Sequence, residues 1–225
     1  MKIAIHQPNF LPWTGYFYKM ANSDIFVFLD NVQYEKNSVI NRNKIKISQG
    51  LFWITLPIRK KNSQLINETE LLNFSREKER IIKTLKLNYQ KAKYFDFIFP
   101  ELENILEKDW QYLSELNIEL IKFLKRKIGI KTKLEIVSGH GVLGEKTDLL
   151  INICKFFDAD TYLSGEGGRE YQDEEKFKIA KIKLEYSNFV YPVYPQQWGK
   201  FAPNLSIVDL LFNCGPDSLK ILLGE

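Results

Sequence analysis

The chain has 225 residues, of which 44% are hydrophobic and 27% are charged, as in an ordinary globular protein with one sizeable domain. Its 32 lysines and arginines against 28 acidic residues give a net charge of +4, which excludes a strongly basic nucleic-acid-binding surface unless the cations cluster. Two histidines and two cysteines are too few for a three-histidine metal site, a cysteine-rich zinc site or a disulfide framework. Because Cys154 and Cys214 lie among apolar residues, we predict that both are buried thiols.

The lengths of the apolar runs indicate whether the chain spans a membrane or carries a signal peptide. None approaches the ~20 residues that a membrane-spanning helix needs, and the run near the N-terminus is too short for a signal peptide. We therefore expect a soluble, cytoplasmic protein without a membrane span and without nucleic acid among its partners.

The first 30 residues predict a strand, a helix and a second strand. Residues 2–6 alternate as in a short buried strand, and residues 24–29 form a continuous apolar strand. Between them, and after a proline that suits a first helical turn, four apolar side chains have the spacing of one helix face: Trp13, Tyr16, Phe17 and Met20. This order is a βαβ unit, which is typical of a parallel sheet.

The middle of the chain changes from a polar segment to helices. Residues 31–58 are polar and basic and end in a strand-like stretch, which predicts an excursion with a β-ribbon. Residues 75–128 have helical periodicity. We expect three helices there: one over 76–89 capped by Ser75, one opened by Pro100, and one over 114–127 that ends at Gly129.

A second βαβ unit follows in the last third of the chain. Its parts are a strand at 133–137, a helix at 148–157 capped by Thr147, and a strand at 160–163 that runs into a glycine-rich loop. Ser206 is expected to cap a final helix over residues 207–212.

Two βαβ units predict one α/β domain over residues 1–225, with a mainly helical insertion at about 70–130. The predicted architecture is a Rossmann-like, mostly parallel sheet flanked by helices. Ligands of such folds bind at the carboxyl ends of the strands, which are residues 6–9 after the first strand and 164–168 after the last.

Two residues at strand ends are the predicted catalytic groups. His6 can exchange protons near neutral pH, and Asp30 follows the second strand in the same way. A capping or structural role is the alternative for His6. We find neither a nucleophile elbow nor an obvious Ser/His/Asp set, so a hydrolase triad is not supported.

The predicted substrate-binding residues come from four places. Amides and cations with few acids suit an anionic, oxygen-rich ligand such as a nucleotide-sugar, although a solvated basic hairpin would have the same composition. The glycine-rich loop matches neither the phosphate-loop nor the dinucleotide pattern, and a simple turn is its alternative. The residues are Gln7, Asn9 and Tyr16 near the first strand; Gln33, Lys36, Asn41 and Arg42 in the basic segment; Ser164, Gly165, Gly167, Gly168 and Tyr171 in or after the glycine loop; and Gln196.

Five blocks of the sequence resemble the WbqC-like family. They are IAIHQPNFLPWTGYFYKMANSDIFVFLDNVQYEKNSVINRNKI, WITLPI, KTDLLINICKFFDADTYLSGEGGREY, YPQ and LSIVDLLFNCG, and they extend from Ile3 to Gly215. The resemblance implies a bacterial protein of surface-polysaccharide (O-antigen) gene clusters. It also implies the transfer of glycine, or a related acyl group, onto a sugar. It brings no established catalytic residues, so the predicted site rests on structural inference at the family's motif positions.

A second resemblance concerns only the first βαβ unit. Its strand, polar turn and helix are similar to the opening of HIGH-type nucleotidyltransferases and of pantothenate synthetase, which bind ATP phosphates with a histidine-containing turn. The corresponding residues here are 12–15, and both histidines are missing. This departure puts ATP-dependent adenylation in doubt, and a shared fold does not establish a shared function.

Three functions remain open at this point. The first is an acyl- or aminoacyl-transferase that acts on an amino sugar or nucleotide-sugar and takes its acyl group from a thioester or an aminoacyl compound. The second is an enzyme that activates a small carboxylate with ATP. The third is a non-catalytic protein that binds a polysaccharide precursor. Apart from the acyl donor or ATP of these reactions, no cofactor is expected.

Overall fold

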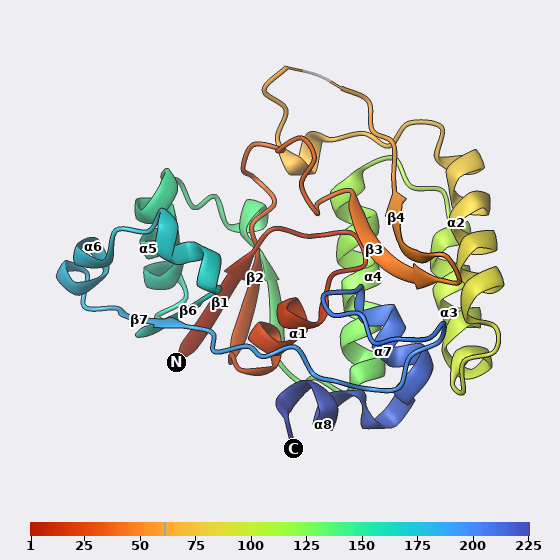
Figure 1. Ribbon diagram of the computed structural model, residues 1–225. Coiled ribbons are helices and arrows are strands. Elements are labelled where there is room, and N and C mark those ends of the chain that lie inside the picture. The colour runs from red at the N-terminus through yellow and green to blue at the C-terminus, as the bar shows by residue number, and fades with distance from the viewer. Residues whose placement is uncertain (61) are drawn as a thin grey trace.

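The computed structural model describes residues 1–60 and 62–225, and it confirms an α/β fold with a parallel sheet (Figure 1). The sheet has five strands in the order β5-β2-β1-β6-β7, and every neighbouring pair is parallel. The strands are β1 (Lys2–His6), β2 (Ile25–Phe28), β5 (Lys133–Ile136), β6 (Thr161–Ser164) and β7 (Lys183–Tyr186).

The first strand lies in the centre of the sheet, between β2 and β6. Its residue Ile3 pairs with Ile25 on one side and with Tyr162 on the other. The chain adds β2 and β5 on one side of β1, and it adds β6 and β7 on the opposite side. The order therefore reverses between β1 and β6, and ligands of open α/β sheets bind beside the carboxyl ends of the strands at such a reversal.

Alternate residues of the strands face two separate hydrophobic layers. Ala4 and Phe26 face the layer that includes α1 (Thr14–Ala21) and α7 (Ile207–Cys214), whereas Ile3 and Val27 face the layer of α5 (Lys146–Phe156) and α6 (Glu174–Ile179). Figure 1 shows these helices on opposite sides of the sheet. This alternation follows from the two-residue period of a strand, and it points the side chain of His6 toward α1.

Three consecutive helices lie between the ribbon and β5. They are α2 (Phe74–Tyr89), α3 (Phe95–Glu107) and α4 (Leu113–Ile128), and Gly129 ends α4 in the left-handed conformation as predicted. Two predicted starts are wrong. Asn73 precedes α2, so Ser75 lies inside the helix, and Pro100 also lies within α3. In the first turn of α3, Phe95 stacks on Phe99 with 4.5 Å between the ring centroids.

The ribbon of the polar segment is confirmed. It consists of β3 (Arg42–Ile47) and β4 (Gly50–Thr55), which pair antiparallel. Ser206 caps α7 as predicted, because its hydroxyl accepts a hydrogen bond from the Val208 amide. Thr147 does not cap α5, which follows Glu145; its hydroxyl instead accepts a hydrogen bond from Asp173. Several further elements were not predicted from the sequence: α6, β7, α8 (Ser218–Leu223) and the short turns η1 (Ile66–Glu68), η2 (Val137–His140), η3 (Glu166–Glu170) and η4 (Gly215–Asp217).

Both thiols are buried and unpaired, as predicted. Burial raises the pKa of Cys154 to about 12 and that of Cys214 to about 11. Among the described residues, no helix has the length and apolar character needed to cross a membrane.

A buried polar network holds the extended tail against the ribbon and α7. The ammonium of Lys46 donates hydrogen bonds to Gln196 Oε1 (3.1 Å) and to the carbonyl of Gly199 (3.4 Å). Beside it, the hydroxyl of Tyr89 donates to Asp209 Oδ2 at 2.7 Å. Burial raises the pKa of Asp209 from 3.8 to about 6, and the hydrogen bonds and the charge of Lys46 oppose this rise only in part.

The raised pKa of Asp209 predicts a stability that falls as pH rises. Between pH 4 and pH 6 the folded chain keeps a proton on Asp209 that the unfolded chain has lost, so this group's contribution is largest at low pH and is lost through pH 6. The difference amounts to about 3 kcal/mol at most. Urea unfolding at pH 4 and pH 7 should therefore show that Asp209→Asn gains free energy of unfolding relative to the wild type at the higher pH. The same pH slope in both proteins would contradict this.

Candidate functional site

His6 lies at the carboxyl end of β1, packed among aromatic rings of the α1 side. Its ring centroid is 4.7 Å from that of Tyr16 and 5.5 Å from that of Trp13. Nδ1 lies 3.1 Å from the carbonyl oxygen of Gln7. Because a carbonyl oxygen only accepts hydrogen bonds, Nδ1 carries the proton of the neutral ring and Nε2 carries the lone pair. Among the described residues no hydrogen bond to Nε2 is found, so this nitrogen is available to accept a proton.

The surroundings of His6 keep its ring neutral. Burial lowers the pKa of His6 well below the ordinary value of 6.5, and the positive charge of Lys19 lowers it further, whereas the hydrogen bond to Gln7 opposes these effects. A histidine with such a pKa is in its basic form at neutral pH.

Lys19 is a residue of this site that the sequence analysis did not single out. Its side chain is only 4% exposed, and its ammonium donates a hydrogen bond to the carbonyl of Ile5 at 2.9 Å. Burial lowers the pKa of Lys19 to about 7. In the part of the chain that the structure describes, it forms no ion pair with a carboxylate. The available signal was a lysine three residues after Tyr16, on the apolar side of a short helix.

The glycine-rich loop follows β6, the strand beside β1. A Cβ atom on Gly168 would lie 2.2 Å from the hydroxyl oxygen of Ser164, so only glycine fits there without a shift. Gly165 and Gly167 face open space, because no atom lies within 4 Å of the position that a Cβ atom would take. Within the described chain, the amides of Glu166 and Gly167 donate no hydrogen bond. The loop therefore combines one tightly packed glycine with backbone donors that a ligand can reach.

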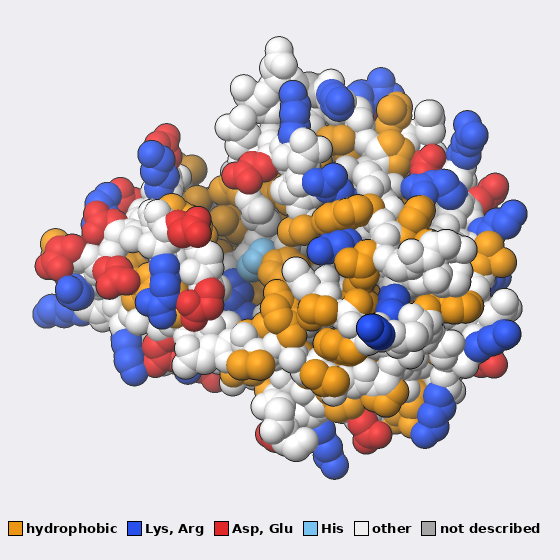
Figure 2. All heavy atoms as spheres, in the orientation of Figure 1, with side chains coloured by type: hydrophobic (Ala, Val, Ile, Leu, Met, Phe, Trp, Pro, Cys, Tyr) orange, Lys and Arg blue, Asp and Glu red, His pale blue; other side chains and the backbone are white. Residues whose placement is uncertain are grey.

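A hollow separates the part of the molecule built by α5, α6 and β7 from the larger part that holds α2, α3 and α4 (Figure 2). A histidine side chain lies inside it. Tyr171 follows the glycine loop and is 70% exposed. Partial burial raises the pKa of Tyr171, and the negative charge of Glu35 raises it further.

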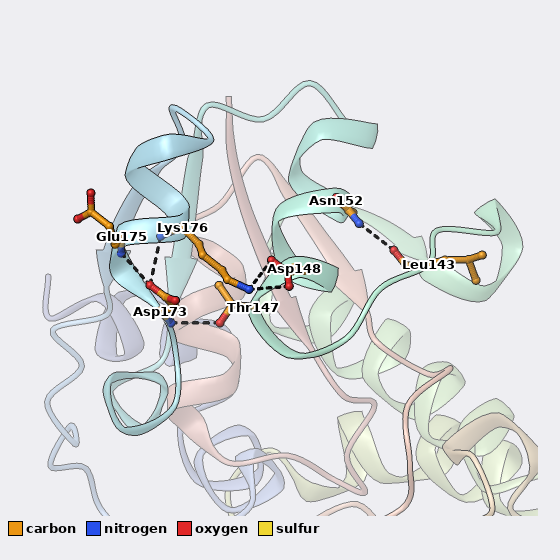
Figure 3. A network of polar contacts seen from close by, with 7 residues as sticks. All are labelled: Leu143, Thr147, Asp148, Asn152, Asp173, Glu175 and Lys176. Carbon is orange, nitrogen blue, oxygen red and sulfur yellow. Dashed lines mark hydrogen bonds and ion pairs between the residues drawn. The ribbon is translucent and has the colours of Figure 1, made fainter.

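Polar contacts between α5 and α6 hold the far end of the glycine loop (Figure 3). The carboxylate of Asp173 caps α6 by accepting hydrogen bonds from the amides of Glu175 and Lys176, and its own amide donates to Thr147. Lys176 donates to both carboxylate oxygens of Asp148, at 2.9 and 2.7 Å. The loop is thus fixed at one end by β6 and at the other by α5.

Asp30 is buried at the end of β2, and both of its carboxylate oxygens are bonded. Oδ1 accepts a hydrogen bond from the amide of Ser138 (3.1 Å), and Oδ2 accepts one from the Ser138 hydroxyl (2.6 Å). These bonds join the end of β2 to η2, which follows β5. The catalytic role of Asp30 stays a prediction. Its hydrogen bonds give it a structural role, because they join the loop after β2 to η2.

The structure places one of the predicted binding residues beside His6 and engages others elsewhere. Tyr16 lies beside His6, and its hydroxyl donates a hydrogen bond to the carbonyl of Gln7 (3.2 Å). Asn41 donates to the carbonyl of Leu56 (2.7 Å) and so holds the ribbon in place. Arg42 stacks on the ring of Trp53, 4.7 Å from its centroid.

The remaining predicted residues differ in their surroundings. Gln33 forms an isolated bridge with Leu65, and Lys36 is exposed. Gln196 belongs to the tail network, because its Oε1 accepts hydrogen bonds from Lys46 and from Ala202. It also lines a cavity of about 500 Å³, none of whose lining residues belongs to the sheet or to the loops that follow β1 and β6. Asn9 is buried, and neither polar atom of its amide has a partner among the described residues.

The surroundings of Gly167 and Gly168 predict different effects of the same substitution. Gly168→Ala should lower the free energy of unfolding by about 1–3 kcal/mol, because its new methyl group overlaps Ser164 and Gln172. Gly167→Ala should change the free energy of unfolding by less than about 0.5 kcal/mol, because no atom lies within 4 Å of the new methyl group. Urea unfolding of both variants measures the difference, and equal stabilities would show that the loop does not pack against Ser164 as described.

Comparison with known proteins adds three findings. The model of the WbqC-like protein family matches residues 7–221. The uncharacterized protein Rv1507c of Mycobacterium tuberculosis is 39% identical over 226 residues, which covers 97% of each chain. No solved structure matches the chain.

Proposed function

The chain belongs to the WbqC-like protein family, and from this premise we propose that it is an acyl- or aminoacyl-transferase. It attaches a glycine-like group to an amino sugar or nucleotide-sugar in the assembly of surface polysaccharide (O-antigen). One observation carries the proposal: a neutral histidine with a free Nε2 lies where the strand order reverses, between β1 and the glycine loop of β6. The substrate class and the pathway come from the family resemblance.

In this proposal His6 acts as the general base. The neutral amine of the sugar attacks the carbonyl carbon of the acyl donor, and its nitrogen must lose a proton as the new carbon–nitrogen bond forms. Nε2 of His6 takes that proton. The bond from the carbonyl carbon to the leaving group, a thiol or a hydroxyl, then breaks, and the leaving group receives the proton.

The glycine loop would stabilise the negative charge that develops on the carbonyl oxygen. The amides of Glu166 and Gly167 are unbonded backbone donors, and preorganised donors of this kind contribute strongly to acyl transfer. Both belong to a loop held by β6 and α5, so they would not need to reorganise during the reaction.

Lys19 has a positioning and tuning role in the proposal. Its charge disfavours the protonated form of His6, which widens the pH range over which the base is free. Replacing it by methionine keeps the length of the side chain and removes the charge.

The first test compares the two histidines of the chain. Purified protein is incubated with amino-sugar nucleotides and a panel of thioester and aminoacyl donors, and mass spectrometry detects an acyl mass gain on the sugar. His6→Gln should lower the rate by about 10²- to 10⁴-fold, because it removes the general base. His140→Gln is the matched control, since His140 is bonded to Glu135 and is not part of the proposed machinery, and it should retain the wild-type rate.

Each other outcome of this test points to a specific alternative. Equal rates in the wild type and His6→Gln would remove His6 from the mechanism. Pyrophosphate release that requires ATP and glycine would favour carboxylate activation. Binding of the sugar nucleotide without a mass gain from any donor would favour a non-catalytic binding protein.

The charge of Lys19 predicts a shift in the titration of His6. Lys19→Met removes a nearby cation, so the pKa of His6 should rise and the acid limb of the rate profile should move to higher pH. Nuclear magnetic resonance titration of the two histidine rings measures this directly, with His140 as the internal control. An unchanged His6 titration in the variant would show that Lys19 does not act on the base.

A further inference from the structure

Four asparagine side chains beyond β1 and β2 contain buried polar atoms that have no hydrogen-bond partner among the described residues. We call them the asparagine cluster: Asn9, Asn31, Asn67 and Asn117. Asn9 is 1% exposed and Asn117 is 0% exposed. Both lie within or against the first loop of the site, and the proposed mechanism does not use them.

The loops that carry Asn9 and Asn31 begin on neighbouring strands. His6 pairs with Phe28 across β1 and β2, and the amide of Leu29 donates to the carbonyl of His6 at 2.9 Å, which extends the pairing by one residue. Asn9 and Asn31 each come three residues after that pair. The two loops therefore leave the sheet side by side.

Hydrogen bonds tie the other two asparagines to the same loops. The amide nitrogen of Asn117, on α4, donates to the carbonyls of Pro8 (2.9 Å) and Ile40 (2.8 Å). The backbone amide of Asn67, in η1, donates to the carbonyl of Asp30 at 2.9 Å. Each loop thus carries one asparagine of its own and holds a second one from a neighbouring element.

The unpaired atoms of the asparagine cluster are mainly acceptors. Because Asn117 Nδ2 donates to two carbonyl oxygens, its orientation is settled, and its unpaired Oδ1 is an acceptor. The Oδ1 atoms of Asn9, Asn31 and Asn67 are also unpaired, and Asn9 Nδ2 is an unpaired donor. A buried amide without partners costs folding free energy, about 1–3 kcal/mol per group, so packing alone does not account for Asn9.

This set of atoms selects the chemistry of a ligand. Four uncharged acceptors and one donor suit a group that offers several O–H and N–H donors, and they disfavour a phosphate, which offers only acceptors. A cation also prefers oxygen ligands, but Asp30, the carboxylate that precedes Asn31, uses both of its oxygens for Ser138. Throughout the described chain, no group of three or more histidine, cysteine, aspartate or glutamate side chains is placed to hold a metal ion.

We infer that the asparagine cluster binds the ring hydroxyl and amino groups of the acceptor sugar, beside His6. This assignment rests on the proposed function, because it names the part of the acceptor that the same site recognises. Asn9 follows His6 by three residues on the same loop. A sugar held there would have its amine next to the base that deprotonates it.

Replacing Asn9 with leucine, which is similar in size, separates recognition from folding. The probes are uridine-diphosphate-glucosamine and uridine-diphosphate-galactosamine, with uridine diphosphate alone for comparison, and calorimetry measures their binding. Asn9→Leu should bind both sugar nucleotides at least tenfold more weakly than the wild type and should bind uridine diphosphate with unchanged affinity. Its urea midpoint should stay equal or rise, because the variant removes unpaired buried polar atoms.

Two asparagine variants serve as controls. Asn152→Leu lies on α5, where the side chain donates to the carbonyl of Leu143 (Figure 3), and it should bind the probes like the wild type. Asn117→Leu loses two hydrogen bonds and should lower the urea midpoint. This contrast distinguishes a recognition residue from one that also holds the fold together.

The outcomes separate this inference from the proposed function. A wild type that binds the sugar nucleotides but transfers no acyl group would contradict the transferase and support the cluster. Transfer with unchanged sugar affinity in Asn9→Leu would overturn the cluster and leave the transferase standing. The inference is also overturned if the wild type binds neither sugar nucleotide. A lower urea midpoint with unchanged sugar affinity in Asn9→Leu would also overturn it. So would a melting temperature that rises with potassium or calcium ions but not with the sugars, if this rise is lost in Asn9→Leu.

Discussion

The parallel pairing of β1 with β2 on one side and with β6 on the other is the constraint on which the site depends. It sets the reversal of strand order, and it places the end of β1 beside the loop that follows β6. Residues more than 150 positions apart in the chain become neighbours through this pairing alone. The side-chain alternation along β1 then turns His6 toward α1, where aromatic rings and Lys19 surround it. Hydrogen bonds of Asp30 and Asp173 hold the surrounding loops, so His6 and the glycine loop lie on supported backbone.

Among the described residues, a buried lysine without an ion pair to a carboxylate occurs both at this site, as Lys19, and in the tail network, as Lys46. Most described ion pairs lie at the surface, where they contribute little to stability. Lys19, in contrast, is buried beside a histidine, and both have a lowered pKa because the surroundings disfavour their charged forms. Perturbed pairs of this kind cluster at functional sites more often than at structural ones.

The sequence predicted those features that depend on local periodicity. Alternation along residues 2–6 and helical spacing from Trp13 to Met20 identified the first βαβ unit, and the position of His6 at the end of its first strand made it a candidate. Tertiary contacts decided the rest. The bonding of Asp30 to Ser138 requires β5 to lie beside β2, which no local pattern reveals. Likewise, the burial of Lys19 depends on how α1 sits against the sheet, and no spacing rule predicts it.

Alkylation of the two cysteines can be used to follow local unfolding of this protein in solution. Cys154 belongs to the apolar layer of α5 and α6, and Cys214 belongs to the layer on the opposite face of the sheet. Only a thiolate that reaches solvent reacts with an alkylating reagent, so the fully buried Cys154 reacts when its layer opens, whereas Cys214 also lines the cavity of about 500 Å³. The labelling rate of Cys154 therefore reports the opening of the layer of α5 and α6, and that of Cys214 reports access through the cavity as well.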